Sequence, residues 1–202
     1  MTENKASFFA RLEPRLAPSE LVKVRAAYYL AKYGHRAQVR KETDGQGHPL
    51  RYFEHVRRVA IVLMDEADCY DPDLICTALL HDALEDTEDI DSAIIEQMFG
   101  PAVARRVRLL TKDPKEGYVD RLKLADDETL LVKACDRLDN LRSLGETTSA
   151  FRKKQFLETL ETYWPLFREL ESSVTFKILD ILTQARQSGE LSCHPSDLGI
   201  GG

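Results

Sequence analysis

Apolar residues recur at steps of three and four along most of the chain, which is the period of a helix that buries one face. In residues 18–33, PSELVKVRAAYYLAKY, the pattern opens beside Ser19, a residue type that favours helix starts. Residues 34–50 and 111–117 interrupt it with polar residues, glycine and proline, and are predicted to be loops. The pattern predicts helices over 18–33, about 50–67, 72–86, 91–100, 101–110, 118–125 and 127–144, and one long helix or a pair of helices over about 149–188.

The fold class follows from what this pattern contains and what it lacks. No strand-like alternation of apolar and polar residues extends beyond a few positions, so we expect an all-α helical bundle with short connections. A chain of 202 residues, 43% of them hydrophobic, is long enough for one substantial core. We expect residues 18–188 to form this domain, 1–17 to be an N-terminal extension and 189–202 to be a flexible tail.

Charge and composition exclude several classes of partner. With 28 basic and 34 acidic residues the net charge is −6, which argues against nucleic acid as a partner. No apolar run approaches the roughly 20 residues that span a bilayer, and the N-terminus lacks the apolar region of a signal peptide, so no membrane association is expected. The four cysteines form no CxxC pair, and a reducing cytoplasm is the expected compartment.

The first chemical signal is His81-Asp82, which lies in the apolar stretch LICTALLHDALEDTEDI with Glu85 and Asp86 one turn later. His81 and Glu85 are four residues apart, as are Asp82 and Asp86, so the groups project toward one end of a helix face. Removing four ionisable groups from water is costly without compensation, which a divalent cation supplies. The alternative is a helix C-terminus with solvated acids and a hydrogen-bonded core histidine.

Two residues on other predicted helices extend this set. His55 shares a helix face with Tyr52 and Val59, and Asp136 follows the apolar positions of its own helix. Taken singly, each has an ordinary interpretation, a satisfied core histidine and a solvated acid. Taken with His81 and Asp82, they give two imidazoles and two carboxylates on three helices, as in metal sites of helical bundles. This donor set suits Mn²⁺, Fe²⁺ or Zn²⁺ and lacks the thiolates of a structural zinc site.

The order His, His-Asp, Asp resembles that of the HD-domain metal phosphohydrolases. The surrounding segments resemble, in the same order, the hydrolase domain of bifunctional alarmone enzymes and of small alarmone hydrolases. These segments are GHRAQVRK (34–41), LLHDALEDT (79–87), FGPAVARRVRLLTK (99–112), LVKACDRLDNLRSL (131–144) and FLETLETYWPLF (156–167). The resemblance covers roughly residues 20–170 and implies an HD-domain helical bundle with a metal-centred cleft.

The resemblance also implies an activity and assigns its residues. The family removes pyrophosphate from the 3′ position of guanosine tetra- or pentaphosphate with the help of manganese. The family's metal ligands fall on His55, His81, Asp82 and Asp136. Its catalytic acidic pair, which positions and deprotonates the attacking water, falls on Glu85 and Asp86. Its nucleotide contacts fall on Arg40, Lys41, Asn140 and Ser143.

Further contacts come from position in the chain rather than from the resemblance. Tyr118 and Arg121 precede the Asp136 helix and are candidate nucleotide contacts, although such residues are more often on the surface. Arg36 joins Arg40 and Lys41 in a cation cluster suited to a dense negative charge. Neighbouring carboxylates are expected to raise the pKa of Glu85, which would make it a general base.

The sequence departs from the family pattern at three positions. Val56 stands where a proline is usual, and CDRLDN, with Cys135 and Asp139, stands where ADRLHN is usual. Asp139 is expected to project away from Asp136. These changes leave the substrate open to an adenosine alarmone, a deoxynucleoside monophosphate or a phosphorylated dinucleotide cofactor such as NADPH. A non-catalytic alarmone-binding module is the other alternative. No synthetase region is recognised, so a stand-alone hydrolase is expected, with a homodimer as an open possibility.

Overall fold

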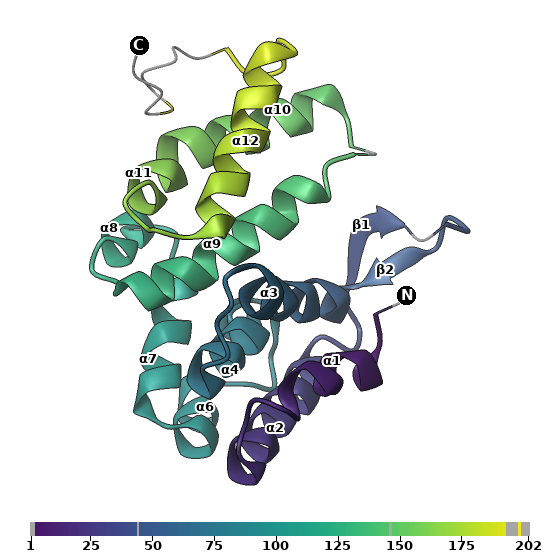
Figure 1. Cartoon of the computed structure of the whole chain (residues 1–202), viewed down its shortest axis with the longest axis vertical. Coiled ribbons are helices and arrows are strands. Elements are labelled where there is room, and N and C mark those ends of the chain that lie inside the picture. The colour runs from purple at the N-terminus through teal and green to yellow at the C-terminus, as the bar shows by residue number, and fades with distance from the viewer. Residues whose placement is uncertain (1–2, 44, 146, 193–197, 199–202) are drawn as a thin grey trace.

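The computed structural model describes residues 3–43, 45–145, 147–192 and 198, and within these the chain is a bundle of helices with one small hairpin (Figure 1). The N-terminal half contains α1 Lys5–Leu12, α2 Pro18–Gly34, β1 Val39–Thr43, β2 Pro49–Arg51, α3 Tyr52–Glu66, α4 Pro72–Leu80, α5 Ala83–Asp86 and α6 Ser92–Phe99. The C-terminal half contains α7 Pro101–Leu110, α8 Tyr118–Leu122, α9 Asp127–Arg142, α10 Ser149–Glu158, the π-helix η1 Thr159–Tyr163, α11 Trp164–Phe167 and α12 Ser173–Gln187. The predicted all-α class is therefore confirmed.

Side-chain caps start the helices that carry the site. The Asp71 carboxylate accepts hydrogen bonds from the backbone N–H groups of Asp73 and Leu74, with Pro72 at the first position of α4. The Asp126 carboxylate accepts one from Thr129 N–H at the start of α9. These caps satisfy orphan backbone donors, so both helices begin at defined residues.

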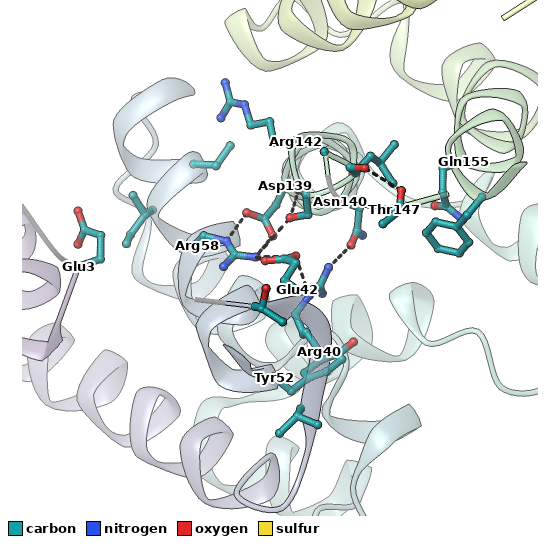
Figure 2. A pocket seen from close by; sticks show the side chains of 18 residues that line it. Glu3, Arg40, Glu42, Tyr52, Arg58, Asp139, Asn140, Arg142, Thr147 and Gln155 are labelled. Carbon is teal, nitrogen blue, oxygen red and sulfur yellow. Dashed lines mark hydrogen bonds and ion pairs between the residues drawn. The ribbon is translucent and has the colours of Figure 1, made fainter. Parts of the chain in front are cut away.

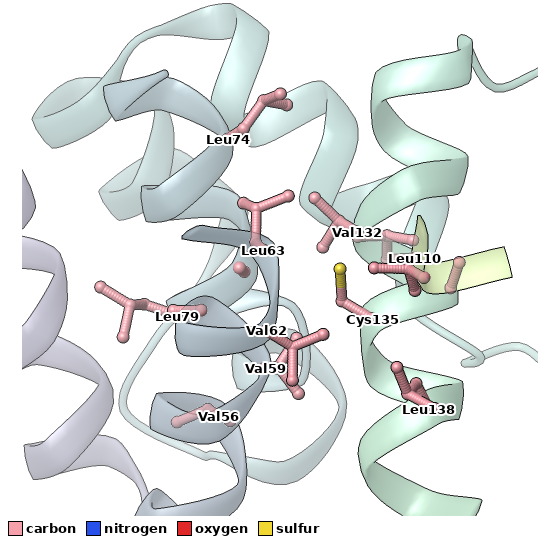
Figure 3. Close-up of a cluster of buried hydrophobic side chains, with 14 of the residues drawn as sticks. Val56, Val59, Val62, Leu63, Leu74, Leu79, Leu110, Val132, Cys135 and Leu138 are labelled. Atoms are coloured by element: carbon pink, nitrogen blue, oxygen red, sulfur yellow. The ribbon is translucent and has the colours of Figure 1, made fainter. Parts of the chain in front are cut away.

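The core lies between α3, α4 and α9, with α7 closing one side (Figure 3). Val56, Val59 and Leu63 project from α3 toward Leu79 on α4 and toward α9, and all four side chains are fully buried. Cys135 of α9 is also buried and packs as a small hydrophobe. His55 is the neighbour of Val56 and Asp136 the neighbour of Cys135, so this packing brings the two polar residues to adjoining positions.

The structure corrects three element predictions. The predicted helix 72–86 is broken, because α4 ends at Leu80 and α5 begins at Ala83. The predicted loop 34–50 contains the antiparallel hairpin, in which Val39 is opposite Arg51 and Thr43 opposite Pro49. Residues 149–188, predicted as one long helix or a pair, contain the π-helix η1 between α10 and α11 and a turn before α12. Each difference depends on pairing or packing between distant residues, which helical periodicity does not report.

The two segments predicted to lie outside the domain, 1–17 and 189–202, both contain buried side chains. Phe8, Phe9 and Leu12 of α1 are buried, and the Phe8 and Tyr28 rings lie 5.1 Å apart, so the predicted extension covers α2. In the predicted tail, Leu191 is buried, whereas 193–197 and 199–202 lie outside the described residues. None of the helices in the described part of the chain is long and apolar enough to cross a bilayer.

Candidate metal centre and adjoining cavity

The four predicted metal ligands converge from three segments of the bundle. His55 Nε2 of α3 lies 3.2 Å from Asp136 Oδ1 of α9 and 3.6 Å from Asp82 Oδ2. His81 Nε2, at the end of α4, lies 3.0 Å from Asp82 Oδ2 and 3.7 Å from Asp136 Oδ1. Donor atoms of His55, His81 and Asp82 all lie within 4.8 Å of one another. The structure thus brings together residues that are 81 positions apart at the extremes, from 55 to 136.

The break between α4 and α5 makes this convergence possible. Asp82 has φ −99° and ψ 0°, a sparsely populated backbone conformation that often occurs at functional residues. His81 Nδ1 lies 2.8 Å from the backbone carbonyl oxygen of Ala78, which directs its other ring nitrogen toward the carboxylates. A continuous helix would place His81 and Asp82 about 100° apart around its axis, so the break turns both toward one point.

The donor chemistry of the cluster fits a divalent cation. His81 Nε2 is buried and, among the described residues, makes no hydrogen bond, although it faces two carboxylates. Both histidines engage Nδ1 elsewhere, His81 with a backbone carbonyl oxygen and His55 with Asp139 Oδ2 at 2.7 Å. The Nε2 atoms are therefore directed at the carboxylates, as expected of imidazole ligands whose other nitrogen donates a hydrogen bond.

A buried lysine compensates the charge of Asp136. Lys133 Nζ donates to Asp136 Oδ2 at 2.7 Å, and both side chains are almost fully buried. Burial by itself raises the pKa of the Asp136 carboxyl, but Lys133, His55 and His81 outweigh it and hold that pKa well below its usual range. The carboxylate of Asp136 is therefore ionised and has Oδ1 directed at the histidines. The sequence interpretation missed Lys133, whose only signal was its position one turn before Asp136.

The acidic pair lies at the same cavity as the cluster. Glu85, Asp86, His55, Asp82 and Asp136 line a cavity of about 290 Å³. Glu85 Oε2 accepts a hydrogen bond from the backbone N–H of Lys112 at 3.0 Å. Burial, and then the negative charge of Asp82, raises the pKa of Asp86. Burial and the nearby carboxylates thus raise the pKa of one member of the acidic pair, Asp86.

Tyr52 borders this cavity and contacts a predicted ligand. Its hydroxyl donates a hydrogen bond to Asp82 Oδ2 at 2.7 Å, and burial followed by the charge of Asp82 raises its pKa above the usual range. Tyr52 lies one turn before His55 on the same helix face, which was the signal available in the sequence. Its place in the site was not predicted.

A larger cavity, of about 780 Å³, adjoins the first one (Figure 2). Tyr52, Asn140 and Gln155 line both cavities and form their common border. Arg40 Nη2 donates to Asn140 Oδ1 at 2.9 Å, and Asn140 Nδ2 donates to Asp136 Oδ1 at 2.6 Å. Val39, Ile61, Leu144 and Phe151 contribute apolar wall. The volume and the mixture of apolar wall and convergent polar groups are typical of small-molecule sites.

The remaining predicted contacts have different surroundings. Ser143 lines the large cavity and donates its hydroxyl hydrogen to the carbonyl oxygen of Asp139. Tyr118 is buried, with its ring centroid 5.9 Å from Lys133 Nζ. Arg121 donates to the backbone carbonyl oxygens of Glu116 and Pro114, so its contact with a nucleotide stays a prediction.

Arg36, a member of the predicted cation cluster, does not join Arg40 at the large cavity. Arg36 is half-exposed, pairs with Asp89 at 2.8 Å and is not among the residues that line the large cavity. The Lys41 side chain lies outside the part of the structure that is described. Arg40 is thus the described member of the cluster that lines the large cavity.

The expectation for Asp139 is wrong. Its carboxylate does not project away from the site but accepts from His55 Nδ1 at 2.7 Å and from Arg58 Nε at 2.7 Å. Positions 136 and 139 are three residues apart and share a helix face, so both carboxylates reach the α3 side of α9. The helical spacing was the signal that could have found this contact.

Two histidines and two aspartates that face one point inside a bundle of helices are typical of proteins that bind a metal ion between their helices. The family model described as HD domain matches residues 27–171, and this chain belongs to the HD-domain family, whose members bind divalent metals. The bounds of the matched region include all four residues of the cluster.

The chain is also similar to named proteins. It is 31% identical over 172 residues to the bifunctional (p)ppGpp synthase/hydrolase SpoT of Escherichia coli, covering 79% of this chain and 23% of that protein. It is 37% identical over 163 residues to the guanosine-3′,5′-bis(diphosphate) 3′-pyrophosphohydrolase of Aquifex aeolicus, covering 76% of this chain and 22% of that protein. The chain thus spans roughly a fifth of the length of these curated relatives.

A solved structure covers nearly the same length as this chain. It was described as a metazoan ortholog of SpoT that hydrolyzes ppGpp and plays a role in starvation responses. The two structures have a TM-score of 0.71 and 30% sequence identity, over 87% of this chain and 99% of that one. The fold described above is therefore shared with a domain of similar size.

Proposed function

We propose that this chain is a metal-dependent phosphohydrolase that removes pyrophosphate from the 3′ position of guanosine tetra- and pentaphosphate. The observation that carries the proposal is the common border of two cavities, one holding the His/Asp cluster with an acidic pair and the other large enough for a nucleoside. The names of the relatives and the description of the similar structure support this substrate class.

His55, His81, Asp82 and Asp136 would hold the ion, and Mn²⁺ is the proposed metal because a mixed set of imidazoles and carboxylates suits it. The bound ion would supply positive charge at the phosphoryl oxygens and lower the pKa of a nearby water. Lys133 keeps Asp136 ionised, and Tyr52 fixes one oxygen of Asp82 by hydrogen bonding. These contacts would hold the ligand atoms in place before the substrate arrives.

Glu85 and Asp86 would orient the attacking water and take its proton. Both carboxylates line the cluster cavity, and the raised pKa of Asp86 makes it a better proton acceptor than an exposed aspartate. The water oxygen would attack the phosphorus bound to the ribose O3′. The bond from that phosphorus to O3′ would break, pyrophosphate would leave, and O3′ would receive a proton.

The nucleoside would occupy the large cavity. Asn140 stands at its border with the cluster cavity and accepts a hydrogen bond from Arg40 in the large cavity, and both would contact the ribose and phosphates. Ser143 lines the wall beyond them, and Lys41, Tyr118 and Arg121 remain proposed contacts from the sequence. A nucleotide bound this way would span both cavities, with its reacting phosphate at the cluster.

The cytoplasm is the proposed compartment. Cys69, Cys76 and Cys135 are free thiols in the described structure, which fits a reducing environment.

The decisive experiment measures pyrophosphate release from guanosine tetraphosphate by purified protein, in Mn²⁺ and again in EDTA. We expect pyrophosphate release in Mn²⁺ but not in EDTA. The Asp82→Ala variant should release none and should also lose its metal. Parallel assays contain an adenosine alarmone, a deoxynucleoside monophosphate and NADPH. Faster turnover of one of these would contradict the guanosine assignment, and tight binding of guanosine tetraphosphate without turnover would indicate a binding module.

A further inference from the structure

A continuous chain of charged contacts leads from the hairpin to His55. Arg58 Nη2 donates to Glu42 Oε2 at 2.9 Å, and Arg58 Nε donates to Asp139 Oδ1 at 2.7 Å. The second oxygen of Asp139 lies 2.7 Å from His55 Nδ1 (Figure 2 shows the contacts of Arg58). Asp139 and His55 are buried, and the three elements β1, α3 and α9 each contribute a member.

This arrangement distinguishes the two histidines of the cluster. His81 Nδ1 lies 2.8 Å from a neutral acceptor, the backbone carbonyl oxygen of Ala78. His55 Nδ1 instead faces the carboxylate of Asp139 at 2.7 Å, and this carboxylate also forms an ion pair with Arg58, whose Nε donates to Oδ1 at 2.7 Å. A negatively charged acceptor pulls the Nδ1 proton more strongly and increases the electron density available at Nε2.

Asp139 also stands where this sequence leaves the family pattern, since alarmone enzymes have ADRLHN and this chain has CDRLDN. A histidine at this position would be neutral or cationic, whereas Asp139 gives His55 and Arg58 an anionic partner. The carboxylate is held on one oxygen by Arg58 Nε and on the other by His55 and by Arg58 Nη2 at 3.1 Å. Its orientation is thus fixed from two sides.

We propose that Asp139 is a positioning residue that fixes the tautomer of His55 and strengthens Nε2 of His55 as a metal donor, with Arg58 and Glu42 holding Asp139 in place. The proposal rests on the metal site of the proposed function. It assigns Asp139 no contact with substrate. Metal ligands of this kind, with a carboxylate behind the histidine, lose about 10- to 100-fold in metal affinity when the outer partner is mutated.

The test compares Asp139→Asn and Asp139→Ala with the unaltered protein. Asparagine keeps the shape and still offers its amide oxygen to Nδ1, but it removes the charge and places an NH2 group where Oδ1 accepts from Arg58, whereas alanine removes both acceptors. The dissociation constant for Mn²⁺ is measured without any nucleotide, from the electron paramagnetic resonance signal of free Mn²⁺. We expect a loss of about tenfold for asparagine and up to about 100-fold for alanine. The matched control is Asp65→Asn, which removes a carboxylate that pairs with Arg11 on the surface.

A second readout reports the tautomer directly. With Zn²⁺ bound and ¹⁵N-labelled histidine, His55 Nδ1 should give the signal of a protonated nitrogen in the unaltered protein, and that signal should shift or broaden in Asp139→Ala. Circular dichroism establishes that each variant is folded. If folded Asp139→Asn and Asp139→Ala bind Mn²⁺ within threefold of the unaltered protein, the proposal is wrong.

These outcomes are separable from the proposed reaction. Metal affinity that depends on Asp139 in a protein that does not hydrolyse guanosine tetraphosphate would uphold the role of Asp139 and contradict the proposed activity. Hydrolysis of guanosine tetraphosphate by a protein whose metal affinity does not depend on Asp139 would uphold the proposed activity and contradict the role of Asp139.

Discussion

Replacing Lys133 with methionine tests the electrostatic account of the cluster most directly. Methionine retains the length and apolar stem of lysine, so it fills the space between Tyr118 and Tyr163, whose ring centroids lie 5.9 and 5.6 Å from Lys133 Nζ. The variant removes the cation that lies 2.7 Å from Asp136 Oδ2 and leaves a buried carboxylate. The expected effect differs between metal-free and metal-loaded protein.

The magnitude follows from what remains around Asp136. Breaking a buried ion pair by removing one partner costs about 3–5 kcal/mol. Asn140 still donates to Asp136 Oδ1 at 2.6 Å and His55 Nε2 lies at 3.2 Å, so we expect a loss near the lower end, about 3 kcal/mol, in EDTA. A divalent cation at the cluster would take over the compensation of this carboxylate. The loss in saturating Mn²⁺ should therefore be smaller, by about 1.4 kcal/mol or more, which equals about a tenfold gain in metal affinity.

Urea unfolding of both proteins in EDTA and in saturating Mn²⁺ gives the four free energies of unfolding, and calorimetric titration gives the affinity independently. The two routes must agree, because they close one thermodynamic cycle. An equal or larger loss of stability in Mn²⁺ would refute the reasoning, since it would mean that the ion does not compensate Asp136.

Three further predictions concern the core, the chemistry and pH. Leu63→Ala, at a fully buried core position of α3, should cost about 2–5 kcal/mol in urea unfolding yet leave Mn²⁺ affinity unchanged, which makes it the stability control for Lys133→Met. Glu85→Gln should keep metal and nucleotide binding but slow turnover by roughly 10²–10⁴-fold in steady-state kinetics, and a near-normal rate would remove Glu85 from the chemistry. Burial opposes protonation of His55 and His81, but Asp136 and Asp82 outweigh it and raise their pKa values to about 9 and about 10 in the metal-free protein. Their protonated forms therefore stabilise that state fully below about pH 6.5, and this stabilisation disappears as pH rises through the raised pKa values. Mn²⁺ should accordingly bind more tightly with rising pH and release about two protons near pH 7.5, measured by calorimetry in buffers of different ionisation enthalpy.

The local pattern of residues was sufficient to predict several helices and to indicate the residues of the cluster. A face of apolar residues at helical spacing depends only on neighbours along the chain, so α3, α7 and α9 were predicted within a few residues. The residue types at His55, His81, Asp82 and Asp136 indicated metal chemistry before any contact was known. The resemblance then indicated the order in which these helices contribute to one site.

Contacts between elements were decided by the tertiary structure. The break after Leu80, the pairing within the hairpin and the burial of Lys133 depend on residues far away in the sequence, to which helical periodicity is insensitive. The direction of Asp139 shows the distinction well. Its spacing from Asp136 was visible in the sequence, but its role depends on Arg58 and His55 lying opposite it on α3. Periodicity identifies which face of a helix is turned inward, whereas packing determines which side chains that face meets.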